Sequence, residues 1–162
     1  MILGHDELVR RQNELFPDLN PIKIGPASVD VRIGKWLQLE NGYRVESFEH
    51  NSDGYPYFLE PGQFVLVDML ESVHVPLDLS AMFALKSTRA REGYQHAVAG
   101  WVDPGWRGIL TMELKNNTQH TNLPLYPGMP IGQLIFMKTL DAVEYQGRYQ
   151  GSTTVSGPRE EV

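Results

Sequence analysis

The sequence of 162 residues contains no cysteine. A chain without cysteine cannot form disulfides, use a thiolate nucleophile or bind zinc or an iron–sulfur cluster through sulfur. Positive charge is also scarce, with 14 Lys and Arg against 20 Asp and Glu and a formal net charge of −6. This balance disfavours a general nucleic-acid coat protein and a protein that binds anionic membranes.

Long apolar runs are missing as well. No stretch approaches the roughly 18–20 apolar residues that a membrane-spanning helix needs. The first residues, MILGHDELVRR, turn polar after three apolar side chains and lack the core of a signal peptide. We therefore expect a cytoplasmic protein, or one that a virus makes in the host cytoplasm.

Glycine and proline are frequent, with 15 and 11 residues, and they separate short apolar segments. Helical spacing over His5–Phe16 predicts a short helix that ends at Pro17, and alternation over Ser28–Glu40 predicts a strand. Further strands are expected at Phe64–Leu70, Leu79–Leu85, Ile109–Leu114 and Ile131–Met137. This rhythm predicts one all-β domain over residues 1–162, a compact barrel or sandwich with a short N-terminal helix.

Residues 146–162 contain Gly147, Gly151, Gly157 and a Ser-Thr-Thr run, with little to bury. We expect them to form a mobile C-terminal arm, either disordered or ordered by a ligand.

Cations are concentrated in one segment. Residues 45–85 contain no Lys or Arg, and Lys86-Ser-Thr-Arg-Ala-Arg91 then places three cations and two hydroxyls in six residues. Guanidinium, ammonium and hydroxyl groups suit phosphate oxygens, and the cluster is too small for a polymer backbone. It predicts either a polyphosphate site or a solvated turn whose cations pair with surplus acids.

A Pro-Gly turn lies between Trp101 and Trp106 and follows Asp103. It predicts a tight hairpin whose exposed backbone groups contact the edge of a planar ligand. Asp103 would accept from a sugar hydroxyl or hold a water, or it would only cap its own turn. The two tryptophans are expected in the core or an interface.

The strand after this turn carries an unusual carboxylate. Strict alternation gives two faces, one with Ile109, Thr111 and Glu113 and the other with Leu110, Met112 and Leu114. A carboxylate on a strand fit for burial is costly unless it is paired or used, and general acid–base chemistry is one such use. The alternative is a strand end where Glu113 meets Lys115 or solvent.

Six segments, in this order and spacing, resemble the dCTP deaminase family of the trimeric dUTPase-like superfamily. They are Pro26–Gly34, Leu59–Leu66, Lys86–Arg91, Ala99–Gly108, Thr111–Glu113 and Tyr126–Leu134. The resemblance implies a distorted, jelly-roll-like β-barrel of the dUTPase type and a homotrimer with active sites between subunits. It also implies dCTP or dUTP as substrate, with Mg²⁺ on the phosphates.

The resemblance assigns roles to individual residues. Glu113 matches the general base that activates water for attack on C4 of cytosine, Arg91 keeps Glu113 ionised, and Ser87 with the Ala99 carbonyl aims the water. Substrate-binding positions are Lys86, Thr88, Arg89, Asp103, Thr111, Met112, Tyr145, Arg148 and Gln150. Such a site uses no zinc, unlike the zinc deaminases, which hold the metal with His and Cys.

Three departures from the family pattern are visible. The chain is one residue shorter between Arg91 and His96, Val98 stands where Thr is typical, and the tail is compressed so that Ser152 stands where a Gln often lies.

The function implied is deamination of dCTP to dUTP and ammonia in pyrimidine deoxynucleotide metabolism, toward the precursors of dTTP. Ala99-Gly-Trp-Val-Asp103 resembles bifunctional members that continue to dUMP. That activity, a dUTPase alone and a non-catalytic nucleotide-sensing trimer are the alternatives. The intact set of Ser87, Arg91 and Glu113 argues against the sensor, which needs no base.

Overall fold

The computed structural model describes residues 1–18, 22–40, 42, 44–46 and 56–159. The helices and strands are α1 His5–Leu15, β1 Lys23–Ile24, β2 Val29–Leu39, β3 Arg44–Glu46, β4 Tyr57–Leu59, β5 Phe64–His74, β6 Leu79–Leu85, α2 Ser87–Glu92, β7 Tyr94–His96, β8 Trp101–Val102, β9 Arg107–Asn116, β10 Leu123–Leu125 and β11 Pro130–Lys138.

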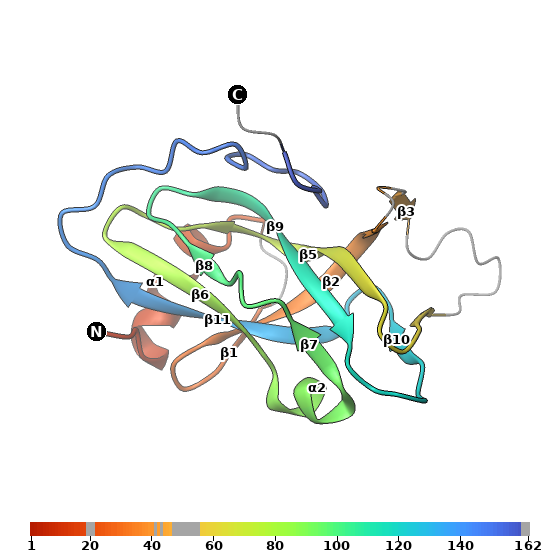
Figure 1. The fold of residues 1–162 in the computed structure, drawn as a ribbon. Helices are drawn as coiled ribbons and strands as arrows, with labels where there is room; N and C mark the ends of the chain where they lie inside the picture. Colours follow the sequence, from red (N-terminus) through yellow and green to blue (C-terminus); the bar gives the residue numbers. More distant parts are fainter. Residues whose placement is uncertain (19–21, 41, 43, 47–55, 160–162) are drawn as a thin grey trace.

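One antiparallel sheet dominates the molecule. Its strands follow the order β7-β9-β5-β2-β11-β6-β8, β1 and β3 also pair with β2, and β10 pairs with β4 separately. The sheet curls into a half-barrel in which β9 and β8, near the two ends of this order, approach each other (Figure 1). The predicted all-β fold with an N-terminal helix is confirmed.

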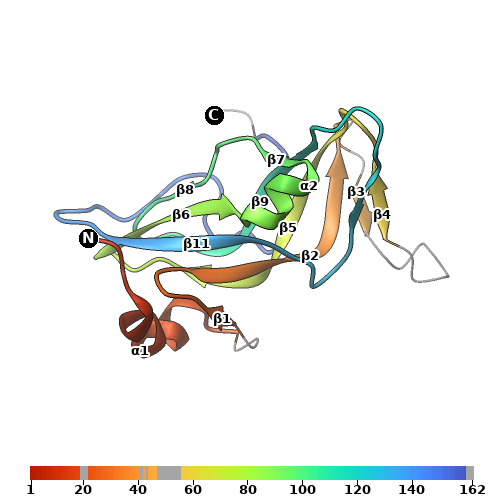
Figure 2. The same ribbon diagram turned by 90° about the horizontal axis from the view of Figure 1, so that it is seen from below.

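Helix α1 packs on the outside of the curled sheet (Figure 2). Leu8 and Leu15 are fully buried, as helical spacing predicts. Arg11, on the same face, donates hydrogen bonds to Asp78 at 2.7 Å and to Glu14 at 2.7 Å. The helix ends at Leu15, two residues before Pro17, which cannot continue it. None of the helices in the described part of the chain is long and apolar enough to span a membrane.

The predicted hairpin between Trp101 and Trp106 is wrong. The turn itself exists: the amide N–H of Trp106 donates to the Asp103 carbonyl at 3.2 Å, and Gly105 has a φ of 79°. However, β8 pairs with β6, whereas β9 pairs with β5 and β7. The turn therefore carries the chain from one end of the sheet order to the other.

A carboxylate is sealed inside the sheet at an irregularity of β2 and β5. Asp68 is 4% exposed and accepts a hydrogen bond of 2.8 Å from the amide of Trp36. Gly34 leaves room for it, because a Cβ there would lie 2.4 Å from the Asp68 Oδ1 atom. Burial raises the pKa of Asp68 to about 6.

The C-terminal segment lies along β9 (Figure 1). The amide of Ile109 donates to the Ser152 carbonyl at 2.7 Å, and the amide of Gly151 donates to the Arg107 carbonyl at 2.9 Å. Val155 is fully buried. The segment thus covers the half of β9 that β7 leaves unpaired, and the mobility expected of residues 146–162 stays a prediction.

Candidate functional site

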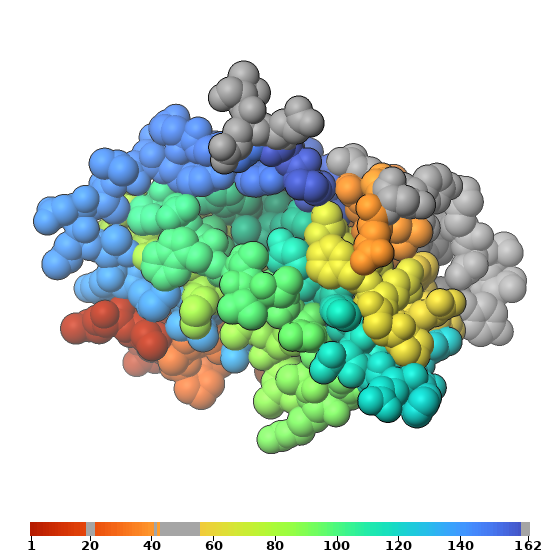
Figure 3. Space-filling view, viewed as in Figure 1, coloured from red at the N-terminus to blue at the C-terminus, as the bar shows by residue number. Residues whose placement is uncertain are grey.

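A pocket of about 530 Å³ opens between β8, β9 and the C-terminal segment. Its size suits a small organic ligand. Of the residues selected from the sequence, it contains Ala99, Asp103, Thr111, Glu113 and Tyr145. The space-filling view shows the C-terminal segment (blue) lying along the edge of the molecule above β9 (Figure 3). The described side chains that line the pocket include no Lys or Arg.

Strand β9 presents Thr111 and Glu113 to the pocket and buries Met112 in the core. The structure therefore does not place the Met112 side chain among the pocket residues. Leu110, expected on the same face as Met112, is partly buried against the core and also contributes to the pocket lining. The pairing of β9 with β5 shifts register between Asp68 and Ser72, so strict alternation fails at this point.

Glu113 is only partly accessible, with 25% of its side chain exposed. Its Oε2 atom is buried and accepts no hydrogen bond from the described residues. An ionisable neighbour is His96, whose Nε2 atom lies 3.2 Å from Oε2 without hydrogen-bond geometry. Oε2 therefore keeps its acceptor capacity for a donor from a bound ligand or water.

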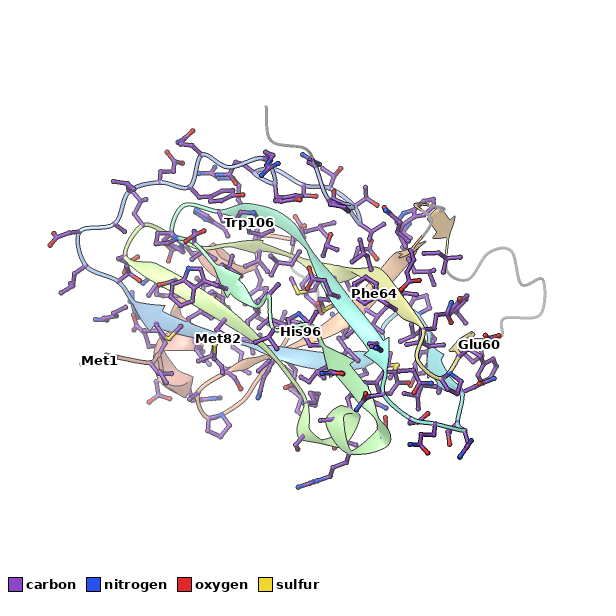
Figure 4. All side chains as sticks on the ribbon, in the orientation of Figure 1. Met1, Glu60, Phe64, Met82, His96 and Trp106 are labelled. Carbon is purple, nitrogen blue, oxygen red and sulfur yellow. The ribbon has the colours of Figure 1, made fainter. Side chains whose placement is uncertain are left out.

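His96 was not predicted as a site residue. Its side chain is 9% exposed and contacts the Phe83 ring edge to face, with centroids 4.7 Å apart. Figure 4 shows His96 at the end of β7 and Trp106 near the C-terminal segment. The sequence offers one indication of His96, its position three residues before Ala99. Its contact with Glu113 depends on the pairing of β7 with β9, which the local sequence does not reveal.

The loop that carries Ala99 is strained and closely held. Val98, a β-branched residue, has a φ of 64°, which side chains of this type rarely adopt. Gly100 accepts a hydrogen bond of 2.7 Å from the Phe83 amide, and a Cβ at Gly100 would lie 2.6 Å from the Phe83 carbonyl oxygen. The Ala99 backbone is therefore fixed against β6.

Asp103 lies at the end of β8, on the opposite wall from β9. The indole Nε1–H of Trp101 donates to its Oδ1 atom at 2.9 Å. Trp101 is 57% exposed, whereas Trp106, which also lines the pocket, is 5% exposed and belongs to the core. The carboxylate of Asp103 is thus oriented by a neighbour two residues away.

The predicted cation segment does not reach this pocket. Ser87, Thr88 and Arg91 are exposed on α2, which lies on the opposite side of the molecule from the C-terminal segment in Figure 1. None of them, and neither Lys86 nor Arg89, lines the pocket. One chain therefore keeps its cation segment apart from Glu113.

Two of these cations have acidic partners within the chain. The Lys86 ammonium lies 2.6 Å from the Asp30 carboxylate, and the Arg89 guanidinium lies 2.5 Å from Glu92. Arg89 also donates to the Pro130 carbonyl at 2.9 Å. The expectation that cations of this segment pair with surplus acids is met by these two.

The three tail residues selected from the sequence behave differently. Tyr145 lines the pocket. The side-chain amide of Gln150 accepts from the Arg107 amide at 2.9 Å and donates to the Gly105 carbonyl at 2.9 Å. Arg148 donates to a carbonyl within the tail. Gln150 and Arg148 thus contact backbone groups, and of these three residues only Tyr145 lines the pocket.

No group of three or more His, Asp or Glu side chains that could hold a metal ion occurs among the described residues. The two carboxylates of the pocket, Asp103 and Glu113, come from the turn after β8 and from β9, and His96 on β7 contacts Glu113.

Comparison with known proteins extends over most of the chain. The model of the dCTP deaminase-like family matches residues 2–139. A protein named dCTP deaminase, dUMP-forming, from Acidothermus cellulolyticus is 34% identical over 152 residues, covering 82% of this chain and 79% of that protein. A protein of the same name from Clavibacter michiganensis subsp. michiganensis is 36% identical, covering 82% of this chain and 75% of that one.

Two solved structures share the fold. The 2′-deoxycytidine 5′-triphosphate deaminase from Agrobacterium tumefaciens has a TM-score of 0.68 at 20% identity, covering 83% of this chain and 48% of that chain, about half its length. The EIAV dUTPase has a TM-score of 0.54 at 17% identity, covering 78% of this chain and 90% of that one.

Proposed function

The chain belongs to the dCTP deaminase-like family, and from this membership we propose that it catalyses the hydrolytic deamination of dCTP to dUTP and ammonia. The observation that carries the proposal is Glu113, whose buried Oε2 atom lacks a hydrogen-bond donor among the described residues and faces a pocket of suitable size. Ala99, Asp103, Thr111 and Tyr145 line the same pocket.

In the proposed reaction, Glu113 takes a proton from a water molecule that attacks C4 of the cytosine ring. It delivers this proton to the ring nitrogen N3, then takes the proton of the new C4 hydroxyl and passes it to the amino group, so that the C4–N bond breaks, ammonia leaves and the carbonyl of uracil forms. The Ala99 carbonyl and the Ser87 hydroxyl orient the water, and Arg91 keeps Glu113 ionised.

This mechanism requires more than one chain. Ser87 and Arg91 lie on α2, outside the pocket that holds Glu113. Both are exposed, so that a neighbouring copy can accept them. We therefore place the active site between subunits of a homotrimer, with the pocket from one subunit and α2 from another.

Charge supports the same arrangement. A triphosphate brings several negative charges to a pocket whose described lining contains two carboxylates and no Lys or Arg. Lys86, Arg89 and Arg91 of a neighbouring subunit would supply cations, and Mg²⁺ would enter on the phosphates as part of the substrate. The proposed deamination uses no zinc, because Glu113 activates the water.

A second step has support of its own. The relatives at 34% and 36% identity are named dUMP-forming, and Ala99–Asp103 includes the residues of this chain that resemble bifunctional enzymes. We propose that dUTP, once formed, is hydrolysed to dUMP and pyrophosphate, with Asp103 orienting a second water for attack on phosphorus.

The products decide between these activities. We expect purified protein with dCTP and Mg²⁺ to release ammonia and to yield dUMP and pyrophosphate when the nucleotides are resolved by chromatography. Accumulation of dUTP would limit the activity to deamination. Turnover of added dUTP without turnover of dCTP would identify a dUTPase, and tight binding of dCTP without any product would identify a nucleotide sensor.

A further inference from the structure

We propose that Trp101 is a positioning residue, which fixes the carboxylate of Asp103 to receive the 3′-hydroxyl of the bound deoxynucleotide. The proposal rests on the proposed function, since it concerns how the same pocket selects its substrate. It concerns binding of dCTP for the deamination step, so its test is made on that step whether the reaction stops at dUTP or continues to dUMP.

The backbone of both residues is fixed, that of Trp101 by strand pairing and that of Asp103 by the turn that follows. Trp101 pairs with Met82 across β6 and β8, which fixes its backbone. The Asp103 carbonyl accepts from the Trp106 amide at 3.2 Å, which fixes the turn. Residues two apart on an extended chain share a face, and the Trp101 Nε1 atom accordingly lies 2.9 Å from the Asp103 Oδ1 atom.

Packing within the chain does not account for the position of Trp101. Large aromatic side chains usually stabilise a fold by burying their rings, as Trp106 does with 5% of its surface exposed. Trp101 leaves 57% exposed at the pocket and directs its indole N–H to a carboxylate. Its contribution to the core is therefore small, and its specific contact is with Asp103.

The hydrogen bond has a consequence for substrate binding. A carboxylate has two acceptor oxygens, and no other described residue donates to either oxygen of Asp103. With Oδ1 held by the indole, rotation of the carboxylate is restricted and Oδ2 is left to accept from a ligand. The sugar of dCTP has one free hydroxyl, at the 3′ position, and a hydroxyl is the donor that a fixed carboxylate oxygen suits.

The indole N–H acts through Asp103 and not on the reacting atoms. An indole nitrogen is a donor only, so it cannot take a proton from water or from the sugar. Removing the N–H should therefore weaken recognition of the 3′-hydroxyl and leave the deamination chemistry nearly intact.

The test is Trp101→Phe, which keeps an aromatic ring and removes the N–H. We expect kcat/KM for dCTP to fall about ten-fold, mainly through KM, as for the loss of a hydrogen bond to a charged group. The activity toward 2′,3′-dideoxycytidine triphosphate, which lacks the 3′-hydroxyl, should stay near that of the wild type. Trp36→Phe makes the same chemical change on β2, outside the pocket, and should change neither value.

Two further variants keep the result interpretable. Trp101→His retains a ring N–H and should recover part of the preference for dCTP. In an Asp103→Ala background, which has no acceptor for the indole N–H, Trp101→Phe should cause no further loss, because the two residues act as one unit.

Equal losses on both nucleotides, an unchanged preference in Trp101→Phe, additive losses in the double variant or a wild type that does not distinguish the two nucleotides would overturn the inference. Turnover of dCTP by the wild type is measured separately and tests the proposed function alone.

Discussion

The pocket beside β9 and the short helix α2 differ sharply in charge. The pocket contains the carboxylates of Asp103 and Glu113 and, among its described lining, no Lys or Arg. Helix α2 and its N-cap Lys86 carry three cations and one acid in seven residues. A nucleoside triphosphate needs both environments, one for its base and sugar and one for its phosphates. The proposed site between subunits would bring these two environments together, with the pocket from one chain and α2 from another.

The largest expected effect comes from removing the base in the pocket half. We expect Glu113→Gln to bind dCTP but to lose ammonia release by about 10²–10⁴-fold or more, because the amide keeps its size but cannot accept a proton from water. Nucleotide binding by calorimetry and ammonia release together check this result. Glu40→Gln, the same change at an exposed turn, is the matched control. Turnover of Glu113→Gln within a few-fold of the wild type would remove Glu113 from the mechanism.

Removing Mg²⁺ tests the phosphate half. We expect the deamination rate to fall by about ten-fold or more when free Mg²⁺ is withdrawn, because the cations near α2 do not neutralise a triphosphate alone. The rate should survive a zinc-selective chelator in excess Mg²⁺, since the pocket supplies a carboxylate as base. Inactivation by this chelator, with recovery on addition of zinc alone, would show that the proposed chemistry is wrong.

Mixing two inactive variants tests whether the halves meet between chains. Homotrimers of Glu113→Gln and of Arg91→Ala should each be inactive. After co-refolding in equal amounts, about a quarter of the sites in random trimers would combine an intact Glu113 with an intact Arg91 from the neighbour. The activity of the mixture should return in proportion to this fraction of complete sites. Mixtures that remain inactive, or light scattering that shows a fully active monomer, would contradict the shared site.

The smallest expected effect concerns Asp68, which is buried in the sheet and belongs to neither half of the proposed site. The folded-state pKa of Asp68, about 6, lies above the unfolded value of about 3.9, so the folded state holds this proton more tightly. The Asp68 contribution to the free energy of unfolding is therefore greatest below about pH 4 and is lost as pH rises toward 6.

Replacement by Asn removes this titration. Between pH 4 and pH 7, the difference in free energy of unfolding between the wild type and Asp68→Asn should shift by about 2 kcal/mol in favour of the variant. Urea unfolding of both proteins across this range measures the shift, with the exposed Asp141→Asn as control. A difference that does not change with pH would show that Asp68 is ionised in the folded protein as easily as in the unfolded chain.

Local patterns predicted the main elements well, because alternation and proline placement act within a few residues. The strands β2, β5, β6, β9 and β11 and the end of α1 before Pro17 follow from them. Strand pairing was harder to predict from local patterns. The sequence predicted the turn at Asp103, but the strands on either side of it pair with other strands and not with each other. The departure of Leu110 from alternation depends on the register of β5.

The same limit applies to the site. Glu113 stood out physically, as a carboxylate on a strand otherwise fit for burial. The contact of His96 with Glu113 and the burial of Asp68 depend on pairing across the sheet, which a single sequence does not encode locally. The roles of Ala99 and of the tail residues came from family resemblance, and the structure places Ala99 and Tyr145 at the pocket.

The opening between β8 and β9 has an evolutionary consequence. Ala99, Trp101 and Asp103 lie on one wall of this opening, largely outside the central ladder from β5 to β6, so that substitutions at these positions can leave the core intact. New substrate preferences on this scaffold are therefore most accessible through this wall. Gly100 limits that freedom, because any side chain there would collide with the Phe83 carbonyl and move the wall away from the sheet.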